Sequence, residues 1–277
     1  MIKIVLSVIA LALGILTAFS LDLSIEWTVV ASAGLWIAYM AAFVVLFFLF
    51  IFLVTLPVNK QKEVHKFNKT YRNILAFACD LILALFGVKV KVIGADKVTV
   101  PDGNIIITCN HRSNLDSLIV DKFFRKKPLI FYAKRSLFKI PLVGKLIHKT
   151  GYISLERDNP RKDYLAITKG IDWLTNQDVS VGLFPEGTRS KTLDVLDFKE
   201  GCLHLATKTH LPIVVTCLSG TEKVNDGLLF KRHKVTYKII DCLYYDDYKD
   251  LSKAELAKLL RSKIVSSLNE LEGRSAK

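Results

Sequence analysis

Apolar residues dominate the first 59 positions of the chain. Only three charged residues occur there, namely Lys3, Asp22 and Glu26. One charge-free run extends from Ile4 to Leu21 and a second from Trp27 to Asn59, and each reaches the roughly 20 residues that cross a bilayer core as a helix. We therefore predict two transmembrane helices within residues 1–58. A signal peptide is the alternative for the first run, since Thr17 to Ser20 resembles a small-residue cleavage site.

Between positions 59 and 87, apolar residues recur every three or four positions, with basic residues between them. The apolar positions are Val64, Phe67, Tyr71, Ile74, Ala78, Leu81 and Leu85. This spacing predicts a basic amphipathic helix next to the membrane. The helix either covers the core of the following domain or lies on anionic lipid, and the two roles are compatible.

From position 88 onward, short apolar runs alternate with amphipathic helical patterns. The strand-like runs are VKVKVIG, NIIITC, PLIFYA, GYISLE, VSVGLF, LPIVVTCL and KVTYKII. Helical patterns extend over residues 163–175, 198–208 and 253–271. Strands that are apolar on both faces and separated by helices predict an α/β fold with a largely parallel central sheet flanked by helices. We assign residues 88–277 to this domain.

The distribution of charge predicts how the chain is oriented. The formal net charge is +13, and because the first 59 residues are net −1, the remainder carries +14. The loop between the apolar runs contains no Lys or Arg, whereas NKQKEVHKFNKTYR follows the second run. The positive-inside rule therefore predicts a multi-pass protein of the cell membrane whose α/β domain faces the cytoplasm. Five cysteines without a CxxC pair indicate free thiols in a reducing compartment.

The stretch CNHRSNLDS, residues 109–117, follows the second predicted strand. Ligand sites of open α/β sheets gather at the carboxyl ends of strands. If Asp116 accepts the Nδ1 proton of His111, the Nε2 atom of that ring is free to act as a base. The alternative is a capping box, in which Ser113 caps a helix that contains Asp116. Ser113 and Cys109 are too close to His111 in sequence to be aimed readily at its Nε2. The alternative to an enzyme nucleophile is that His111 activates a hydroxyl group of the substrate.

The stretch FPEGTRS, residues 184–190, follows the fifth predicted strand. Gly187 permits a tight turn, and Arg189 offers a planar set of donors that suits phosphate. We expect Glu186 to pair with an arginine or to hold a hydroxyl, because a free carboxylate would repel a phosphate. A plain solvated turn is the alternative for this peptide.

Further basic residues follow the third and fourth predicted strands. They are Lys134, Arg135 and Arg157. Alone, each is an ordinary surface charge, but at one edge of a sheet they form a basic rim that suits anionic lipid head groups or an acidic carrier protein. Nucleic acid is not an expected partner, because the charge accompanies a membrane anchor and the sequence contains no zinc-finger or RNP-type motif.

Together, NHRSNLD and FPEGTRS resemble the motifs of 1-acyl-glycerol-3-phosphate acyltransferases of the bacterial PlsC type, and YAKRSLFKIPLVG, GYISLER and FKEGCLHLA are similar to other blocks of that family. The resemblance covers about residues 88–219. It departs at Val215, where the family commonly has a second proline after Pro212, so it leaves donor preference open. It implies His111 as the general base and Asp116 as its orienting partner. The acceptor-binding residues that it implies are Glu186, Gly187, Thr188, Arg189, Lys134 and Arg157.

The activity that this resemblance implies is acyl transfer from acyl-ACP or acyl-CoA to the sn-2 hydroxyl of lysophosphatidic acid. The product would be phosphatidic acid for phospholipid biosynthesis, and no metal, cofactor or covalent enzyme intermediate is implied. Three alternatives remain: the same chemistry on glycerol 3-phosphate or another lysophospholipid, a lipid hydrolase, and a basic membrane scaffold without enzymatic activity.

Overall fold

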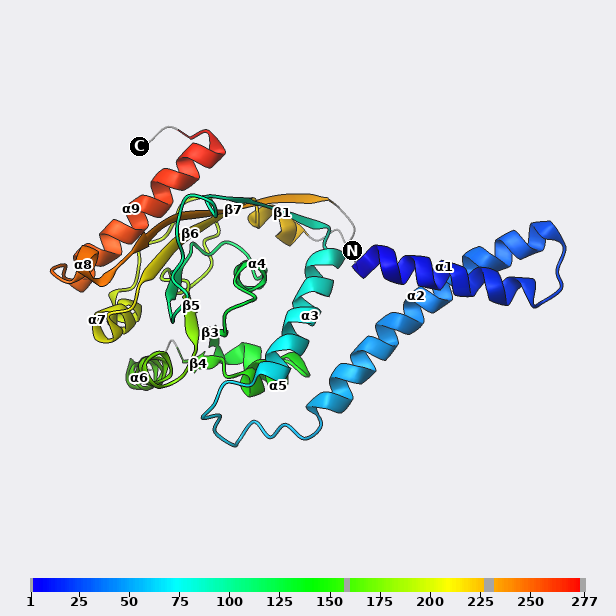
Figure 1. The fold of residues 1–277 in the computed structure, drawn as a ribbon, viewed down its shortest axis with the longest axis horizontal. Coiled ribbons are helices and arrows are strands. Elements are labelled where there is room, and N and C mark those ends of the chain that lie inside the picture. The colour runs from blue at the N-terminus through cyan, green and yellow to red at the C-terminus, as the bar shows by residue number, and fades with distance from the viewer. Residues whose placement is uncertain (1, 157–159, 227–231, 275–277) are drawn as a thin grey trace. The chain divides into compact units, whose positions relative to one another are not determined.

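The computed structural model describes residues 2–156, 160–226 and 232–274, and the chain divides into two compact units, Met1–Asn59 and Lys60–Lys277. The first unit is a hairpin of α1 (Ile2–Phe19) and α2 (Ile25–Thr55) (Figure 1). Within the described residues, α2 is the one helix long and apolar enough to cross a membrane, while α1 contributes a shorter apolar stretch. The two predicted N-terminal helices are therefore present, and spanning by both of them stays a prediction.

The predicted basic helix is shorter than its apolar spacing suggests, because α3 covers only Lys69–Leu85. Asn68 caps it, and the side chain of this residue accepts a hydrogen bond from the backbone N–H of Tyr71 (3.1 Å). Val64 and Phe67 continue the apolar spacing, but they pack against the core from irregular backbone that precedes the helix. These two side chains therefore pack against the core without being part of a helix.

All seven predicted strands are present in one sheet. Their bounds are β1 (Val88–Ile93), β2 (Ile106–Thr108), β3 (Leu129–Lys134), β4 (Ile153–Leu155), β5 (Ser180–Leu183), β6 (Ile213–Ser219) and β7 (His233–Leu243). The strand order is β1-β7-β6-β2-β5-β3-β4. Every neighbouring pair is parallel except β6 and β7, which are antiparallel. The predicted α/β fold with a largely parallel sheet is confirmed.

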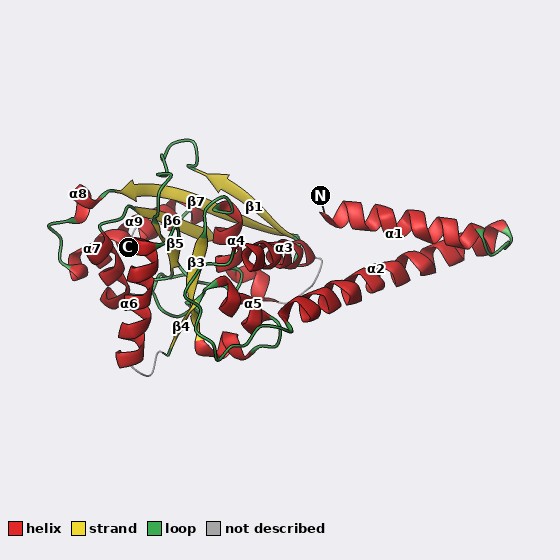
Figure 2. Ribbon diagram, turned by 60° about the horizontal axis from the view of Figure 1, so that its bottom comes forward, coloured by secondary structure: helices red, strands yellow, loops and turns green. Residues whose placement is uncertain are grey.

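Helices cover both faces of this sheet (Figures 1 and 2). On one face lie α3, α4 (Asp116–Phe123) and α5 (Val143–Thr150), and on the other α6 (Pro160–Asn176), α7 (His204–Thr209) and α9 (Lys253–Glu272). Shorter elements are η1 (Arg135–Lys139), η2 (Glu200–Leu203), η3 (Glu222–Asp226) and α8 (Tyr245–Tyr248). The helix predicted over 198–208 is thus divided into a 3₁₀ turn and α7.

Two layers of core explain why the central strands β2, β3, β5 and β6 are continuous apolar runs in the sequence. Ile105 and Ile107 belong to the cluster that packs under α3 and α4, whereas Ile106 belongs to the cluster that contains Trp173 of α6 and Leu260 of α9. Alternate residues of a strand point to opposite faces, so a sheet covered on both sides needs apolar residues at every position.

The parallel arrangement brings the two sequence motifs together. Strands β2 and β5 are neighbours, with Thr108 opposite Leu183. The first motif follows β2 and the second follows β5, so both leave the sheet at the same edge and side by side.

Candidate active site

His111 and Asp116 are hydrogen-bonded in the loop between β2 and α4. The Nδ1 atom of His111 lies 2.9 Å from Oδ2 of Asp116, and the exposed fractions of the two side chains are 18% and 0%. An ionised carboxylate only accepts hydrogen bonds, so Nδ1 carries the proton and Nε2 retains its lone pair. The imidazole is therefore oriented for proton abstraction by Nε2.

The carboxylate of Asp116 is itself fixed by the backbone. Its Oδ2 atom also accepts hydrogen bonds from the N–H groups of Arg112 and Ser113, each at 2.7 Å. The contact with Ser113 is the half of a capping box that the sequence suggests, although α4 begins at Asp116 rather than two residues earlier. The same oxygen atom of Asp116 thus binds the backbone N–H groups of the loop and orients the ring of His111.

Glu186 connects the second motif to the first. This side chain is buried, and its Oε1 accepts the backbone N–H of His111 (2.7 Å) while Oε2 accepts that of Leu196 (2.9 Å). The expected arginine or hydroxyl partner is replaced by these two amides, because the carboxylate points inward to the loop backbone. Burial raises the pKa of Glu186, and the two amide donors partly oppose this shift.

The turn after Glu186 has the conformation that the sequence suggests. Gly187 has φ +67°, and its N–H donates to the carbonyl of Phe184 (2.9 Å). The following residues, Thr188 and Arg189, are exposed. Within the described part of the chain, no hydrogen bond or ion pair involves the guanidinium of Arg189, which leaves it available to an anion.

A pocket of about 200 Å³ contains His111. The ring of Phe184 stacks on the imidazole with centroids 4.4 Å apart. Lys199 also lines the pocket and packs so closely on Gly187 that a Cβ there would lie 2.9 Å from its Cε. Sequence reasoning missed both contacts, although Lys199 is part of the FKEG segment and Phe184 begins the second motif.

Nearby thiols and hydroxyls are poor nucleophiles. Cys109 is buried, and burial raises the pKa of its thiol well above the usual value. Cys202 lines the pocket, but burial raises the pKa of its thiol to about 12. Ser113 is wholly buried. This arrangement favours activation of a hydroxyl on the substrate.

Of the other predicted basic residues, Lys134 and Arg135 do not line this pocket, and the third lies outside the described residues. Lys134 ends β3 and is exposed, on the same face of the strand as Tyr132, which lines the pocket. Arg135 pairs with Glu156, which also accepts a hydrogen bond from Lys162 (2.8 Å). Arg157 lies outside the described residues.

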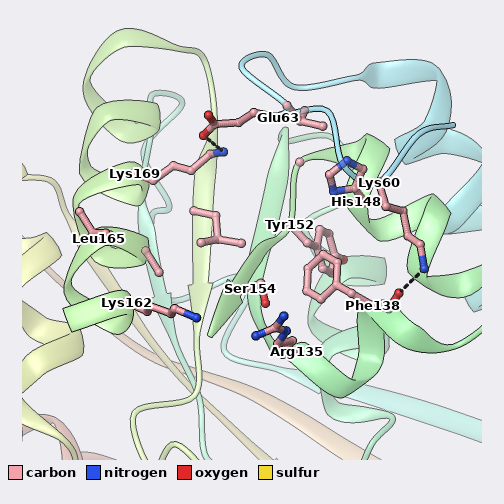
Figure 3. A pocket seen from close by; sticks show the side chains of 14 residues that line it. Lys60, Glu63, Arg135, Phe138, His148, Tyr152, Ser154, Lys162, Leu165 and Lys169 are labelled. Atoms are coloured by element: carbon pink, nitrogen blue, oxygen red, sulfur yellow. Dashed lines mark hydrogen bonds and ion pairs between the residues drawn. The ribbon is translucent and has the colours of Figure 1, made fainter. Parts of the chain in front are cut away.

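A second, cationic groove of about 690 Å³ borders the pocket (Figure 3). Adjacent residues of β4, Ser154 and Leu155, line the groove and the pocket respectively, as do Lys162 and Asp163 of α6. Four basic side chains surround the groove, namely Lys60, Arg135, Lys162 and Lys169. Figure 3 shows Arg135 and Lys162 on either side of Ser154. Apolar side chains such as Ile153 and Leu165 also line the groove, and Glu63 pairs with Lys169 there. The mixture of apolar and cationic side chains suits an amphiphile that carries phosphate.

Comparisons with known proteins agree with this fold and these motifs. The family model described as Acyltransferase matches residues 89–219. The 1-acyl-sn-glycerol-3-phosphate acyltransferase of Borreliella burgdorferi is 32% identical over 207 residues, which cover 72% of this chain and 80% of that protein. The enzyme of the same name from Salmonella typhimurium is 32% identical over 133 residues, 46% of this chain and 54% of that protein. The chain thus matches only about half the length of the Salmonella relative.

Among solved structures, the crystal structure of the 1-acyl-sn-glycerophosphate (LPA) acyltransferase PlsC from Thermotoga maritima superposes with a TM-score of 0.60. The two proteins are 25% identical, and the match covers 82% of this chain and 89% of that chain. The fold and the two motifs thus define an acyltransferase. The chain belongs to the PlsC-type family of 1-acyl-sn-glycerol-3-phosphate acyltransferases. Together with the apolar helix α2, this family points to association with a membrane.

Proposed function

We propose that this protein transfers an acyl chain from a thioester donor to the sn-2 hydroxyl of lysophosphatidic acid, giving phosphatidic acid for phospholipid biosynthesis. The observation that carries the proposal is the hydrogen bond between buried Asp116 and His111, which lines a pocket together with the exposed cation Lys199. The names of the relatives supply the acceptor. The geometry supports the chemistry that such an acceptor requires.

The proposed reaction begins with proton abstraction. Nε2 of His111 takes the proton from the acceptor hydroxyl as its oxygen attacks the thioester carbonyl, and Asp116 stabilises the imidazolium that forms. The tetrahedral intermediate then collapses, the C–S bond breaks, and the departing thiolate takes the proton from Nε2. The new ester and the free thiol account for all atoms, and His111 returns to its neutral form.

The phosphate of the acceptor is assigned to the exposed cations beside His111. Arg189 follows the Gly187 turn, and Lys199 lies against that glycine. A guanidinium and an ammonium on one turn suit a phosphate monoester. Lys134 and Arg157 remain proposed contributors from the adjacent strand ends.

The thioester donor is assigned to the cationic groove. Both acyl-CoA and acyl-ACP carry the acyl chain on a phosphate-bearing pantetheine arm, and the groove borders the pocket along β4 and α6. Arg135 and Lys162 would meet the phosphates while the thioester lies beside His111. Glu156 partly neutralises these two cations in the absence of substrate.

The location of the lipid acceptor supports a membrane-anchored enzyme. We propose that α1 and α2 both span the cell membrane and that the α/β unit faces the cytoplasm, as the basic segment after α2 indicates. Lysophosphatidic acid would then reach the site from the membrane surface and thioester donors from the cytoplasm.

One assay tests the proposal against its alternatives. Purified full-length protein is incubated with lysophosphatidic acid and with acyl-CoA or acyl-ACP, and phosphatidic acid is measured. Formation of phosphatidic acid that increases with both time and enzyme concentration supports the proposal. Preferential acylation of glycerol 3-phosphate or another lysophospholipid would change the acceptor, and release of free fatty acid without acceptor would indicate a hydrolase.

A further inference from the structure

Arg112, the residue after His111, does not face the pocket. Its side chain is 1% exposed, and its Nη1 lies 2.5 Å from Oε1 of Glu272 at the end of α9. Its Nη2 donates to the carbonyl of Leu193, in the loop after the second motif. Glu222 of η3 lies 3.7 Å from the same Nη1. A buried guanidinium therefore joins the catalytic loop to segments far away in the sequence.

Glu272 has further partners that hold its carboxylate in place. Oε1 also accepts a hydrogen bond from the hydroxyl of Ser219 at the end of β6 (2.8 Å), and Oε2 pairs with Arg274. Burial opposes the charge of Glu272, but the hydrogen bonds from Arg112 and Ser219 and the nearby positive charges lower its pKa overall. Glu272 is thus an ionised partner for Arg112 at neutral pH.

Arg112 also contacts the candidate catalytic pair directly, through its backbone. The backbone N–H of Arg112 donates to Oδ2 of Asp116 (2.7 Å), the same atom that accepts the Nδ1 proton of His111. We propose that Glu272 is a positioning residue: through Arg112, the C-terminal end of α9 fixes the loop that aims His111. This inference rests on the proposed acyl transfer.

Removal of one partner leaves a buried charge without its main counter-ion. Arg112 would then turn toward Glu222 or toward solvent, and its backbone N–H would shift relative to Asp116. A displacement of about 1 Å at a reacting group reduces a rate by as much as ~10²-fold. The effect belongs to kcat, because the side chains assigned to the acceptor phosphate lie on a different turn.

The test compares two substitutions on the same helix in the full-length protein. Glu272→Gln retains the size of the side chain and removes its charge. Glu270→Gln is the matched control, because Glu270 pairs with Lys238 of β7 (2.5 Å) rather than with the catalytic loop. Thermal unfolding of each variant reports loosening of α9. Steady-state kinetics report kcat and the KM for lysophosphatidic acid.

We expect Glu272→Gln to reduce kcat roughly tenfold to a hundredfold with little change in KM, and Glu270→Gln to leave both constants near those of the wild type. Equal losses in the two variants, or a loss that only follows thermal stability, would overturn the positioning role. If Glu272→Gln does not fold, Glu272→Asp replaces it, since this change keeps the charge and withdraws the carboxylate from Arg112.

A double-mutant comparison tests whether Glu272 acts through Arg112. The kcat of the double variant Arg112→Gln/Glu272→Gln should be close to that of the slower single variant, because both changes break the same contact. Multiplicative losses would contradict the inference. Absence of acyl transfer by the wild-type protein would contradict the proposed function, whereas an active wild type with unchanged kcat in Glu272→Gln would contradict the positioning role alone.

Discussion

The backbone N–H of His111 donates a hydrogen bond to the carboxylate of Glu186 at 2.7 Å, across 75 residues of sequence. The carbonyl of His111 in turn accepts the N–H of Ser190 (2.8 Å). Both backbone groups of the candidate base are therefore held by the second motif. The two motifs form one structural element, in which FPEGTRS fixes the backbone of His111 and Asp116 fixes its ring.

Asp116→Asn is expected to impair turnover without abolishing folding. The amide retains the size of the carboxylate, but it no longer selects the tautomer that leaves Nε2 unprotonated. We expect kcat to fall by about 10² to 10⁴, the range for general-base catalysis, with little change in the KM for lysophosphatidic acid. Steady-state kinetics check this, and a kcat within twofold of wild type would contradict the assigned role.

Glu186→Gln tests whether Glu186 supports the loop rather than the substrate. One of the two accepting oxygens becomes an NH₂ group that faces a backbone N–H, which leaves that donor unsatisfied at a cost of about 1 to 3 kcal/mol. We expect lower thermal stability together with lower kcat. An increase in the KM for the acceptor alone, with unchanged stability, would instead place Glu186 in contact with the substrate.

Loss of the cations beside the pocket is expected to weaken acceptor binding. Arg189→Ala and Lys199→Met should each raise the KM for lysophosphatidic acid several-fold, by roughly 1 kcal/mol or more for a lost charge-assisted hydrogen bond. Kinetics with varied acceptor at a fixed donor concentration provide the measurement.

Lys249→Met is the control for these changes. Lys249 follows α8, the short helix after β7. The last residue of β7, Leu243, lies opposite the first residue of β6, so Lys249 lies near the end of the sheet opposite to the one from which the two motifs emerge. The KM for the acceptor should be unchanged in this variant. An unchanged KM in both Arg189→Ala and Lys199→Met would move the head-group site elsewhere.

Substitutions in the cationic groove should affect the other substrate. In the double variant Arg135→Gln/Lys162→Gln, the groove loses the two cations that flank Ser154. We expect a higher KM for acyl-CoA and an unchanged KM for lysophosphatidic acid, with a smaller difference at high salt because exposed charges are screened. A raised KM for the acceptor would show that the groove binds lipid phosphate instead.

Short-range patterns in the sequence predicted most of the fold. The central strands β2, β3, β5 and β6 are nearly continuous buried runs, as expected for the part of a sheet that helices cover on two sides, whereas β1 and β7 alternate between more and less buried positions. The helical spacing places the start of α3 too early, because Val64 and Phe67 are half-buried in an irregular segment that continues this spacing. Periodicity reports burial, and it identifies a helix only where the backbone is also regular.

The site was predictable only in part, because its connections cross the sequence. The pair of His111 and Asp116 is local, so spacing indicates it. The backbone partners of Glu186 and the contact of Arg112 with Glu272, 160 residues apart, depend on the folded topology. Residue spacing does not predict such contacts. The repulsion between a free carboxylate and phosphate suggested an arginine or a hydroxyl as the partner of Glu186, whereas the fold supplies two backbone amides.

The central claim is that Nε2 of His111 removes the proton of the acceptor hydroxyl. The most direct test is the turnover of purified His111→Ala with lysophosphatidic acid and acyl-CoA, compared with the wild type at equal folded concentration. We predict that acyl transfer falls by at least about 10², while thermal stability and binding of lysophosphatidic acid stay near those of the wild type. Near-normal acyl transfer by folded His111→Ala protein would contradict the mechanism.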